Sequence, residues 1–253
     1  MDFQFIEMQT TNGVARLTLK RAPLNIINIA MLNELSSALN TLLLDENVQV
    51  LVLSAEGKMF SAGVDVADHT ADKVGEMIPL FDRVCAALAD FPAPTIAVAH
   101  GHALGGGCEL VLCCDLIIAA EGANFGQPEI KLATIAPIAA MRLPGLIGYR
   151  RAAELLFTGE TIGAAEAAKM GLINRAVPID QLEQTVDQLI GKLINLSGPA
   201  LRLCKRALRI TAADQMEKMY LAELMSTEDT QEGLAAFRIR STSRWSRMSS
   251  RML

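Results

Sequence analysis

Short apolar runs alternate with longer stretches of helical periodicity through the first half of the chain, and this alternation restricts the fold more than any other feature. Short apolar runs suit buried strands, whereas apolar residues three and four positions apart suit a helix that lies on a sheet. Their alternation is typical of strands joined by helical crossovers. The predicted strands are Phe3–Met8, Val14–Leu19, Val50–Ser54, Thr95–Ala99 and Leu116–Ala120, and the predicted helices between them are Ile29–Leu44 and Asp72–Phe91.

Asn12 and Gly13 lie between the first two predicted strands. An Asn-Gly pair favours a tight hairpin turn, because both residues tolerate the positive φ that such a turn requires. We therefore expect these two strands to form an antiparallel hairpin at the start of the chain.

Helical periodicity dominates beyond about Arg142, where the only strand signal is Ile173–Val177. The predicted helices are Arg151–Phe157, Ala164–Met170, Gln181–Leu196, Ala200–Ala212 and Gln215–Met225. The fold class is therefore α/β with a helical C-terminal part. The segment 196–199 (Leu-Ser-Gly-Pro) interrupts the pattern, so we place a boundary there between a core, residues 1–195, and a C-terminal helical region, residues 196–253.

Composition limits the class of protein. Hydrophobic residues make up 51% of the 253 residues, enough for a sizeable core, and no apolar run reaches the roughly 18 to 20 residues of a bilayer span. Asp2 and Glu7 lie where a signal peptide would be basic and then apolar, so we expect a cytoplasmic protein with no membrane partner. The net charge of −5 disfavours nucleic acid as a ligand. The five cysteines include no CxxC pair, so we expect neither a disulfide framework nor a metal site.

Three consecutive glycines, Gly105 to Gly107, lie between a predicted strand and an apolar helix. They leave bare N–H groups at a helix N-terminus, which favours an anion there. An oxyanion site and a tight strand-to-helix connection both fit this pattern. Glu109 places a carboxylate in the first turn of the helix, which favours a functional site, although complementarity with the helix dipole also accounts for it. The spacing lacks the glycine signatures of nucleotide-binding loops.

Two further segments carry similar signals. Phe60-Ser-Ala-Gly-Val-Asp65 forms a second glycine-bearing loop after the strand Val50–Ser54, and ligands of open α/β sheets gather at that carboxyl edge. Phe125-Gly-Gln-Pro-Glu129 places a second carboxylate after a proline in an apolar region. Taken alone, Glu129 fits the N-terminus of a helix better than a catalytic role.

These three segments together, the middle one read as His102-Ala-Leu-Gly-Gly-Gly-Cys-Glu109-Leu, resemble the enoyl-CoA hydratase (crotonase) family in order, spacing and residue type. Leu156-Phe-Thr-Gly-Glu160 and Gly171-Leu-Ile-Asn174 also resemble it, so the likeness runs from about residue 5 to about residue 245. The resemblance implies a crotonase-like ββα spiral core with a C-terminal helical trimerisation region. It also implies a homo-oligomer, either a trimer or a dimer of trimers.

The resemblance further implies the residue roles. Two glutamates, Glu109 and Glu129, would hold the attacking water, and the backbone N–H groups of Val64 and Gly106 would form an oxyanion hole, where each donor supplies on the order of 3 kcal/mol. Because coenzyme A is part of an acyl-CoA substrate, no separate cofactor is implied. The residues that correspond to coenzyme A contacts are Ala62, Lys20, Arg21 and Asp65.

The chain departs from the family after the second glutamate. A glycine-rich turn is usual there, whereas Ala133–Met141 contains no glycine, so Ile138 and the two alanines after it predict a more apolar acyl pocket. The segment Gly63–Thr70 also resembles the hydratases of cyclohexa-1,5-diene-1-carbonyl-CoA. We therefore expect a ring-bearing dienoyl-CoA as the preferred substrate, with short linear enoyl-CoAs as the fallback. His69 is a candidate for the border of the acyl pocket.

Other functions on the same fold stay open. An enoyl-CoA isomerase and an acyl-CoA hydrolase are alternatives, although two glutamates favour hydration. A different class is an RNA-binding relative without catalysis, because the end of the chain is basic, and the presence of both glutamates counts against it. The arginines of this basic end are Arg238, Arg240, Arg244, Arg247 and Arg251.

Overall fold

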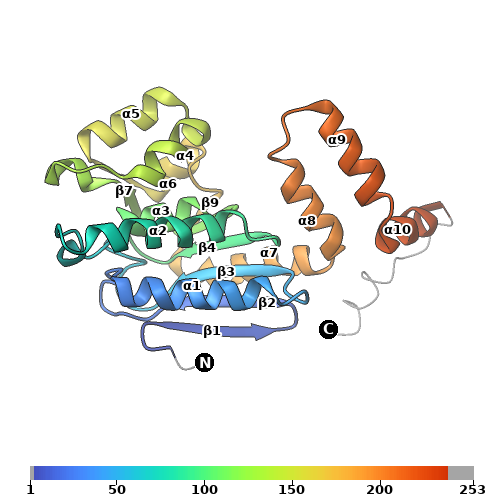
Figure 1. Ribbon diagram of the computed structural model, residues 1–253, viewed down its shortest axis with the longest axis horizontal. Coiled ribbons are helices and arrows are strands. Elements are labelled where there is room, and N and C mark those ends of the chain that lie inside the picture. Colours follow the sequence, from blue (N-terminus) through green and yellow to red (C-terminus); the bar gives the residue numbers. More distant parts are fainter. Residues whose placement is uncertain (1–2, 239–253) are drawn as a thin grey trace.

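The computed structural model describes residues 3–238 and shows a six-stranded sheet with helices on both faces (Figure 1). Its strand order is β1-β2-β3-β4-β6-β9, in which β1 and β2 are antiparallel and each later neighbour is parallel. The expected α/β core is therefore confirmed. The strands are β1 (Ile6–Thr11), β2 (Val14–Leu19), β3 (Val50–Ala55), β4 (Thr95–Ala99), β6 (Leu116–Ala120) and β9 (Arg175–Val177).

The hairpin at the start of the chain is present, but its first strand was predicted too early. β1 begins at Ile6 and continues through Thr11, which pairs with Val14 across the turn. Asn12 and Gly13 both have positive φ, 52° and 78°, as a tight hairpin turn requires. The prediction followed the apolar residues and stopped at Met8, whereas the polar residues after it continue an edge strand that is exposed at its end.

The two faces of the sheet pack against different helices because side chains alternate along a strand. The helices α1 (Ile29–Leu43) and α2 (Val74–Ala89) cover one face, and α7 (Leu182–Ile194) covers the other. On α7 the buried residues recur at every fourth position, which gives the apolar stripe of a helix on a sheet. Leu51, Leu53, Ala97 and Ala99 pack with α1 and α2, whereas Val50, Val52, Ile96 and Val98 pack with Leu182, Val186 and Ile190 of α7.

A second sheet of three short strands lies beside the carboxyl ends of the first, and the sequence did not predict it. It has the order β5-β7-β8, with β5 (Ala103–Leu104), β7 (Asn124–Gly126) and β8 (Thr161–Gly163). Strands of two or three residues are too short to show an apolar period. The helix α3 (Gly106–Leu112) and the 3₁₀ turn η2 (Pro128–Leu132) directly follow β5 and β7.

Three helices follow η2. The prediction for α6 (Ala164–Met170) is confirmed residue for residue, and α5 (Tyr149–Thr158) extends the predicted helix by two residues at its start. The helix α4 (Pro137–Ile147) was not predicted, and it contains two prolines, Pro137 and Pro144. Pro137 occupies the first turn, where its missing N–H leaves no helical hydrogen bond unmade.

The C-terminal helices stand away from the sheet in Figure 1 and confirm a helical C-terminal region. They are α8 (Gly198–Ala207), α9 (Ala213–Met219), a π-helical turn η4 (Tyr220–Leu224) and α10 (Glu228–Arg238). The predicted helix Ala200–Ala212 therefore ends too late, and α10 was not predicted. Lys205 of α8 reaches the core, where its Nζ lies 2.6 Å from Asp115 Oδ2. The boundary proposed after residue 195 falls between α7 and α8 and stays a prediction.

Candidate active site

The three segments singled out in the sequence lie side by side. Ser61 forms an isolated parallel bridge with Ala103 of β5, and the Leu104 N–H donates to Ser61 O at 3.0 Å. On its other side Ala103 pairs with Phe125 of β7. The loop Phe60–Asp65, the glycine triplet and the segment that ends in Glu129 are thus joined by backbone hydrogen bonds.

Each of the three glycines is closely approached by a different neighbour. A Cβ atom on Gly105, whose φ is +52°, would lie 2.5 Å from Glu129 Oε1, and one on Gly106 would lie 2.4 Å from Val64 Cγ2. On Gly107 it would lie 2.5 Å from the Cβ of Ser61. Real Cβ atoms do not approach other atoms this closely, so the triplet allows both the second glutamate and the Phe60–Asp65 loop to come near the helix N-terminus.

The backbone N–H groups of Val64 and Gly106 are not used by the strand bridge and the helix in which these residues lie. Ile27 donates to Gly63 O at 2.9 Å and accepts from the Asp65 N–H at 2.8 Å. In this parallel-bridge pattern the N–H of the intervening Val64 points away from Ile27. Gly106 is the first residue of α3, so the helix does not use its N–H either. A Cβ on Gly63 would lie 3.7 Å from Gly106 N, which shows how close the two loops are.

Glu109 projects from α3 into the interior and is only 3% exposed. The pKa of this carboxyl is raised to about 7, and burial is the main cause. The nearby Glu129 charge also raises it, whereas the hydrogen bond from the Ala139 N–H acts in the opposite direction. Ala139 lies in the first turn of α4 and donates to Glu109 Oε1 at 2.9 Å. The segment Ala133–Met141, which has no glycine, therefore leads into a helix whose N-terminus hydrogen-bonds Glu109.

Glu129 lies in the first turn of η2 and is half-buried. Burial is the main cause that raises the pKa of this carboxyl, whereas the charge of His69 lowers it. Its Oε2 is buried and has no hydrogen-bond partner within residues 3–238. A buried carboxylate oxygen without a partner is costly, so this atom is available for a water or a substrate group.

The residues that correspond to coenzyme A contacts make contacts within the chain. Lys20 lies between two carboxylates, at 2.8 Å from Glu7 and 3.5 Å from Glu56. Arg21 donates to the Ile26 carbonyl at 2.6 Å and lies 3.5 Å from Asp65.

The remaining candidates, Ala62 and Asp65, also have partners in the loop. Ala62 donates its N–H to Leu24 O at 2.9 Å, and Asp65 caps the 3₁₀ turn η1 (Val66–Asp68) by accepting from the Ala67 N–H at 3.1 Å. Their assignment to coenzyme A stays a prediction.

Sequence reasoning missed the residues that hold the loops together. Asn25 is fully buried, and its side-chain amide donates to the Glu56 and Met59 carbonyls at 2.6 and 3.0 Å. Ser61 donates to the Asn25 carbonyl at 2.7 Å. The positive φ of 48° at Asn25 is a backbone signal that suits asparagine, but a sequence shows only that the residue type permits it.

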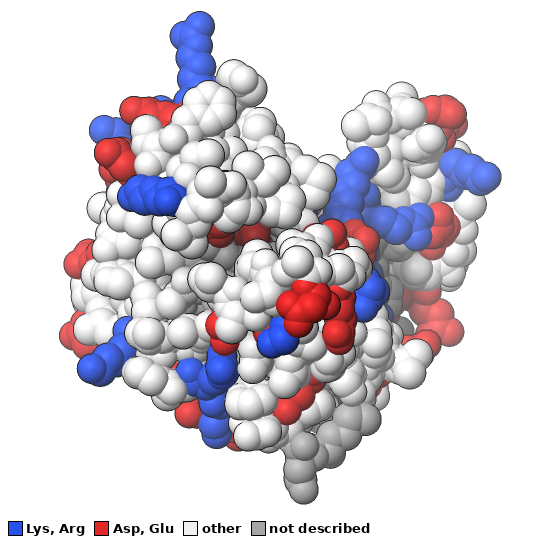
Figure 2. Space-filling model, turned by 60° about the vertical axis from the view of Figure 1, so that its left-hand side comes forward, with Lys and Arg blue, Asp and Glu red and all other residues white. Residues whose placement is uncertain are grey.

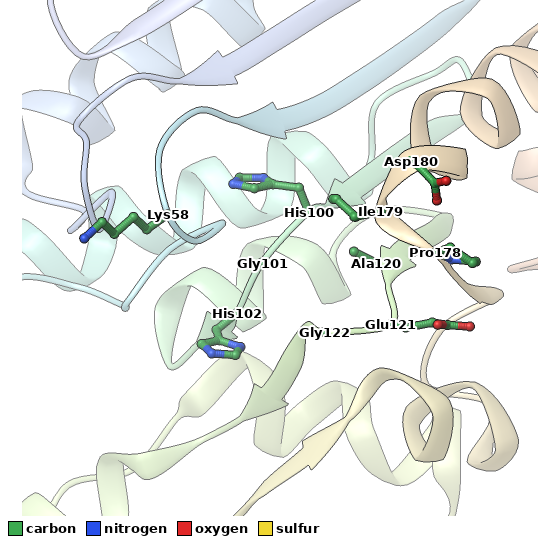
Figure 3. A pocket seen from close by; sticks show the side chains of 10 residues that line it. All are labelled: Lys58, His100, Gly101, His102, Ala120, Glu121, Gly122, Pro178, Ile179 and Asp180. Atoms are coloured by element: carbon green, nitrogen blue, oxygen red, sulfur yellow. The ribbon is translucent and has the colours of Figure 1, made fainter.

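A separate cavity of about 500 Å³ lies at the carboxyl ends of β4, β6 and β9 (Figure 3). Neither glutamate lines it, and its polar side chains diverge, with Lys58 and His100 extending to one side and Glu121 and Asp180 to the other. Two histidines that line the cavity are hydrogen-bonded to the backbone. His100 Nε2 lies 3.0 Å from Gly57 O, and His102 Nδ1 accepts from the Asn124 N–H at 3.1 Å.

The structure also bears on nucleic acid, metal ions and membranes as partners. Basic and acidic side chains are interspersed on the face that Figure 2 draws, so this face carries no continuous basic patch for a polyanion. Among residues 3–238 no three His, Cys, Asp or Glu side chains are grouped as metal ligands would be. None of the helices described is long and apolar enough to cross a bilayer. Most of the arginine-rich end, from Arg240 on, lies outside the described residues.

Comparison with known proteins agrees with the geometry. A probable enoyl-CoA hydratase of Rhizobium meliloti is 36% identical over 246 residues, which cover 94% of this chain and 96% of the relative. The cyclohexa-1,5-dienecarbonyl-CoA hydratase of Thauera aromatica is 33% identical over 245 residues, covering 94% and 95%. The crystal structure of an enoyl-CoA hydratase of Mycobacterium smegmatis superposes with a TM-score of 0.89 at 30% identity, covering 96% of this chain and 99% of that one.

The expected crotonase-like fold is thereby confirmed. The profile of the enoyl-CoA hydratase/isomerase family matches residues 9–247, almost the whole sequence. With its fold and a match to the family over almost its whole length, the chain belongs to the enoyl-CoA hydratase/isomerase family.

Proposed function

We propose that this protein is a hydratase that adds water across the conjugated double bond of an enoyl-CoA thioester. The observation that carries the proposal is the meeting of a buried carboxyl, Glu109, and a half-buried one, Glu129, with two unused amides, Val64 and Gly106. Both carboxyls have pKa values raised by burial, which is the property that general acid–base catalysis near neutral pH requires.

The chemistry follows from where charge develops. When the oxygen of water bonds to Cβ, the π electrons shift toward the thioester carbonyl and form an enolate. The Val64 and Gly106 N–H groups would donate to that oxygen, and each such donor is worth on the order of 3 kcal/mol. One glutamate takes the proton that the water loses, and Cα then receives a proton as the carbonyl re-forms. Hydration therefore adds the elements of one water with no redox change.

Two carboxyls that influence each other are suited to this exchange of protons. The Glu129 charge raises the pKa of Glu109, so ionising one carboxyl disfavours ionising the other. A protonated Glu109 beside an ionised Glu129 would supply an acid and a base at once. An isomerase needs only one such group to move a proton, so the pair favours hydration.

For the acyl group, we propose a ring-bearing dienoyl-CoA. The relative of Thauera aromatica that acts on such a ring supports it. So does the apolar first turn of α4, where Ile138 and Ala139 are buried next to Glu109. Ala140 is exposed, so its predicted place in the pocket wall gains no support. A compact ring suits an apolar wall, because each buried CH₂ contributes about 0.8 kcal/mol.

We expect kcat/KM for the cyclic dienoyl-CoA to exceed that for crotonyl-CoA by at least about tenfold, or about 1.4 kcal/mol of transition-state stabilisation. Loss of the conjugated thioester absorbance follows both reactions on one preparation. An Ile138→Ala variant is the matched control, because removing the side chain should lower the ring's kcat/KM more than that of crotonyl-CoA. If crotonyl-CoA is the better substrate, a hydratase of linear enoyl-CoAs remains. If neither is hydrated, the proposed function is wrong.

We infer that coenzyme A lies along the loop that carries Ala62 and Asp65, near Lys20 and Arg21, and that copies of the chain associate through α8–α10. These helices expose apolar side chains, among them Leu221, Leu234 and Phe237. Such exposure suits a homo-oligomer, a trimer or a dimer of trimers. A cytoplasmic enzyme without a separate cofactor, acting in fatty-acid or aromatic-compound degradation, fits this proposal.

A further inference from the structure

Gln127 is a polar residue that is buried without side-chain hydrogen bonds, two positions before Glu129. It is only 2% exposed, and neither the nitrogen Nε2 nor the oxygen Oε1 of its amide has a partner within residues 3–238. In this part of the chain the buried side-chain atoms without a partner are these two and Glu129 Oε2. A buried donor and acceptor that stay unpaired are costly, so this amide is suited to binding a ligand.

The described part of the chain pairs its other buried polar side chains. Thr95 Oγ1, for example, donates to Asp115 Oδ2 at 3.0 Å. The buried polar residues whose side chains have a hydrogen bond or an ion pair are Asn25, Ser61, Asp68, Thr95, Glu109, Ser197 and Lys205. Gln127 is therefore an exception, and it lies in the segment that carries the second glutamate of the proposed site.

The backbone holds Gln127 beside the glycine triplet. Gly126, the residue before it, accepts from the Gly105 N–H at 2.9 Å. Pro128 follows, and a residue before proline is kept out of the helical region, as the φ of −125° and ψ of 82° at Gln127 show. A Cβ on Gly126 would lie 2.7 Å from a side chain of β8. Because successive side chains alternate, Gln127 lies on the face of this segment away from β8.

The three unpaired atoms match a ligand that both donates and accepts hydrogen bonds. Nε2 of Gln127 only donates, whereas Oε1 and the oxygen atoms of an ionised Glu129 only accept. The oxygen of a water molecule or a hydroxyl group can accept from Nε2 while its hydrogen is donated to Glu129 Oε2. A carbonyl or a thioether has no hydrogen to donate. Water and hydroxyl groups are therefore the ligands that this pair of side chains suits.

We propose that Gln127 binds the water that adds to the double bond, donating from Nε2 to the water oxygen while Glu129 accepts one of the water hydrogens. This inference rests on the hydratase function proposed above. As the oxygen bonds to Cβ, it gives one proton to a glutamate and keeps the other, so it becomes the hydroxyl group of the product. The amide gains and loses no proton, and it holds this hydroxyl as it held the water.

Gln127→Met tests the proposal, because Met has a similar shape and no amide. We expect kcat/KM for the best enoyl-CoA to fall about ten- to a hundredfold while Tm stays the same or rises, since an unpaired buried amide is replaced by an apolar group. Gln188→Met on α7 is the matched control, because Gln188 is exposed on the far face of the sheet, and it should change neither quantity. Unchanged kcat/KM in Gln127→Met overturns the proposal. A lower Tm together with lower kcat/KM assigns the amide a structural role and overturns it as well.

Ligand binding separates this proposal from the hydratase function. 3-Hydroxybutyryl-CoA carries the hydroxyl group in question and butyryl-CoA lacks it, so calorimetry on both ligands measures how strongly the hydroxyl is bound. The comparison is made in Glu109→Gln, to suppress turnover, with and without Gln127→Met. The preference for the hydroxylated ligand should fall at least about fivefold with Gln127→Met, while the Kd of butyryl-CoA stays unchanged.

An undiminished preference contradicts the proposal. If the wild type hydrates no enoyl-CoA, the proposed function fails, whereas the two Kd values still decide whether Gln127 binds a hydroxyl group. If neither ligand binds, both the proposal and the proposed function are wrong.

Discussion

Replacing Glu109 by Gln is expected to lower kcat for hydration by about two to four orders of magnitude, the usual scale for a general acid or base. Gln has nearly the same shape, and its carbonyl oxygen can still accept from the Ala139 N–H that now bonds Glu109. The change therefore removes proton transfer and leaves the packing in place. Steady-state kinetics with the best enoyl-CoA substrate measure the effect.

The folding stability of Glu109→Gln provides the control. Because the pKa of Glu109 is raised from its ordinary value of 4.5 to about 7 in the folded protein, its contribution to stability is present below about pH 4.5 and is lost as the pH rises through about 7. The variant carries no such charge. It should therefore match the wild type below about pH 4.5 and be more stable at pH 8, by at most about 3 kcal/mol. A variant that is less stable at both pH values would indicate misfolding.

Glu129→Gln is expected to cause a loss of the same order as Glu109→Gln, since both carboxyls serve one water. Near-normal turnover in either variant would remove that residue from the mechanism. The double variant should be scarcely slower than either single one, because groups that act on the same proton transfer are strongly non-additive.

Removing the Gly106 N–H should also have a large effect, a fall in kcat of about two to three orders of magnitude in Gly106→Pro. Gly106 is the first residue of α3, a position where helices accept proline, so the helix itself should form. A Cβ at this position would also lie 2.4 Å from Val64 Cγ2, so steric displacement of the second donor adds to the loss.

Two glycine-to-alanine variants separate these causes. Gly106→Ala keeps the N–H but introduces the contact with Val64, so its kcat should lie between those of the wild type and Gly106→Pro. Gly122→Ala is the matched control, because nothing lies within 4 Å of a Cβ at Gly122. Full activity in Gly106→Pro would place the oxyanion site elsewhere.

The sequence predicted the site well where the information is local. The glycine triplet and the strands before it indicated a helix N-terminus beside a sheet edge, and the resemblance added the second glutamate. It did not predict that the helix α4 forms after Glu129. The Ala139 N–H of this helix donates a hydrogen bond to Glu109, which lies 30 residues earlier in the sequence. That contact depends on tertiary packing, which a local sequence pattern does not reveal.

The parts of the fold that were missed are short or depend on distant partners. The strands β5, β7 and β8 have two or three residues each and pair with one another and with Ser61, which is distant in the sequence. Helices α8 and α9 were predicted with ends displaced by several residues, because the terminal turns of a helix are its least sharply defined part.

The central claim is the addition of water to an enoyl-CoA, and its most direct measurement is the reaction of crotonyl-CoA or the cyclic dienoyl-CoA in water enriched in heavy oxygen. We expect the product to gain one water, with the heavy oxygen in a new hydroxyl group on the acyl chain, and to form with the wild type but not with the Glu109→Gln/Glu129→Gln double variant. A product of unchanged mass, as an isomerase gives, or release of free coenzyme A, as a hydrolase gives, would contradict it.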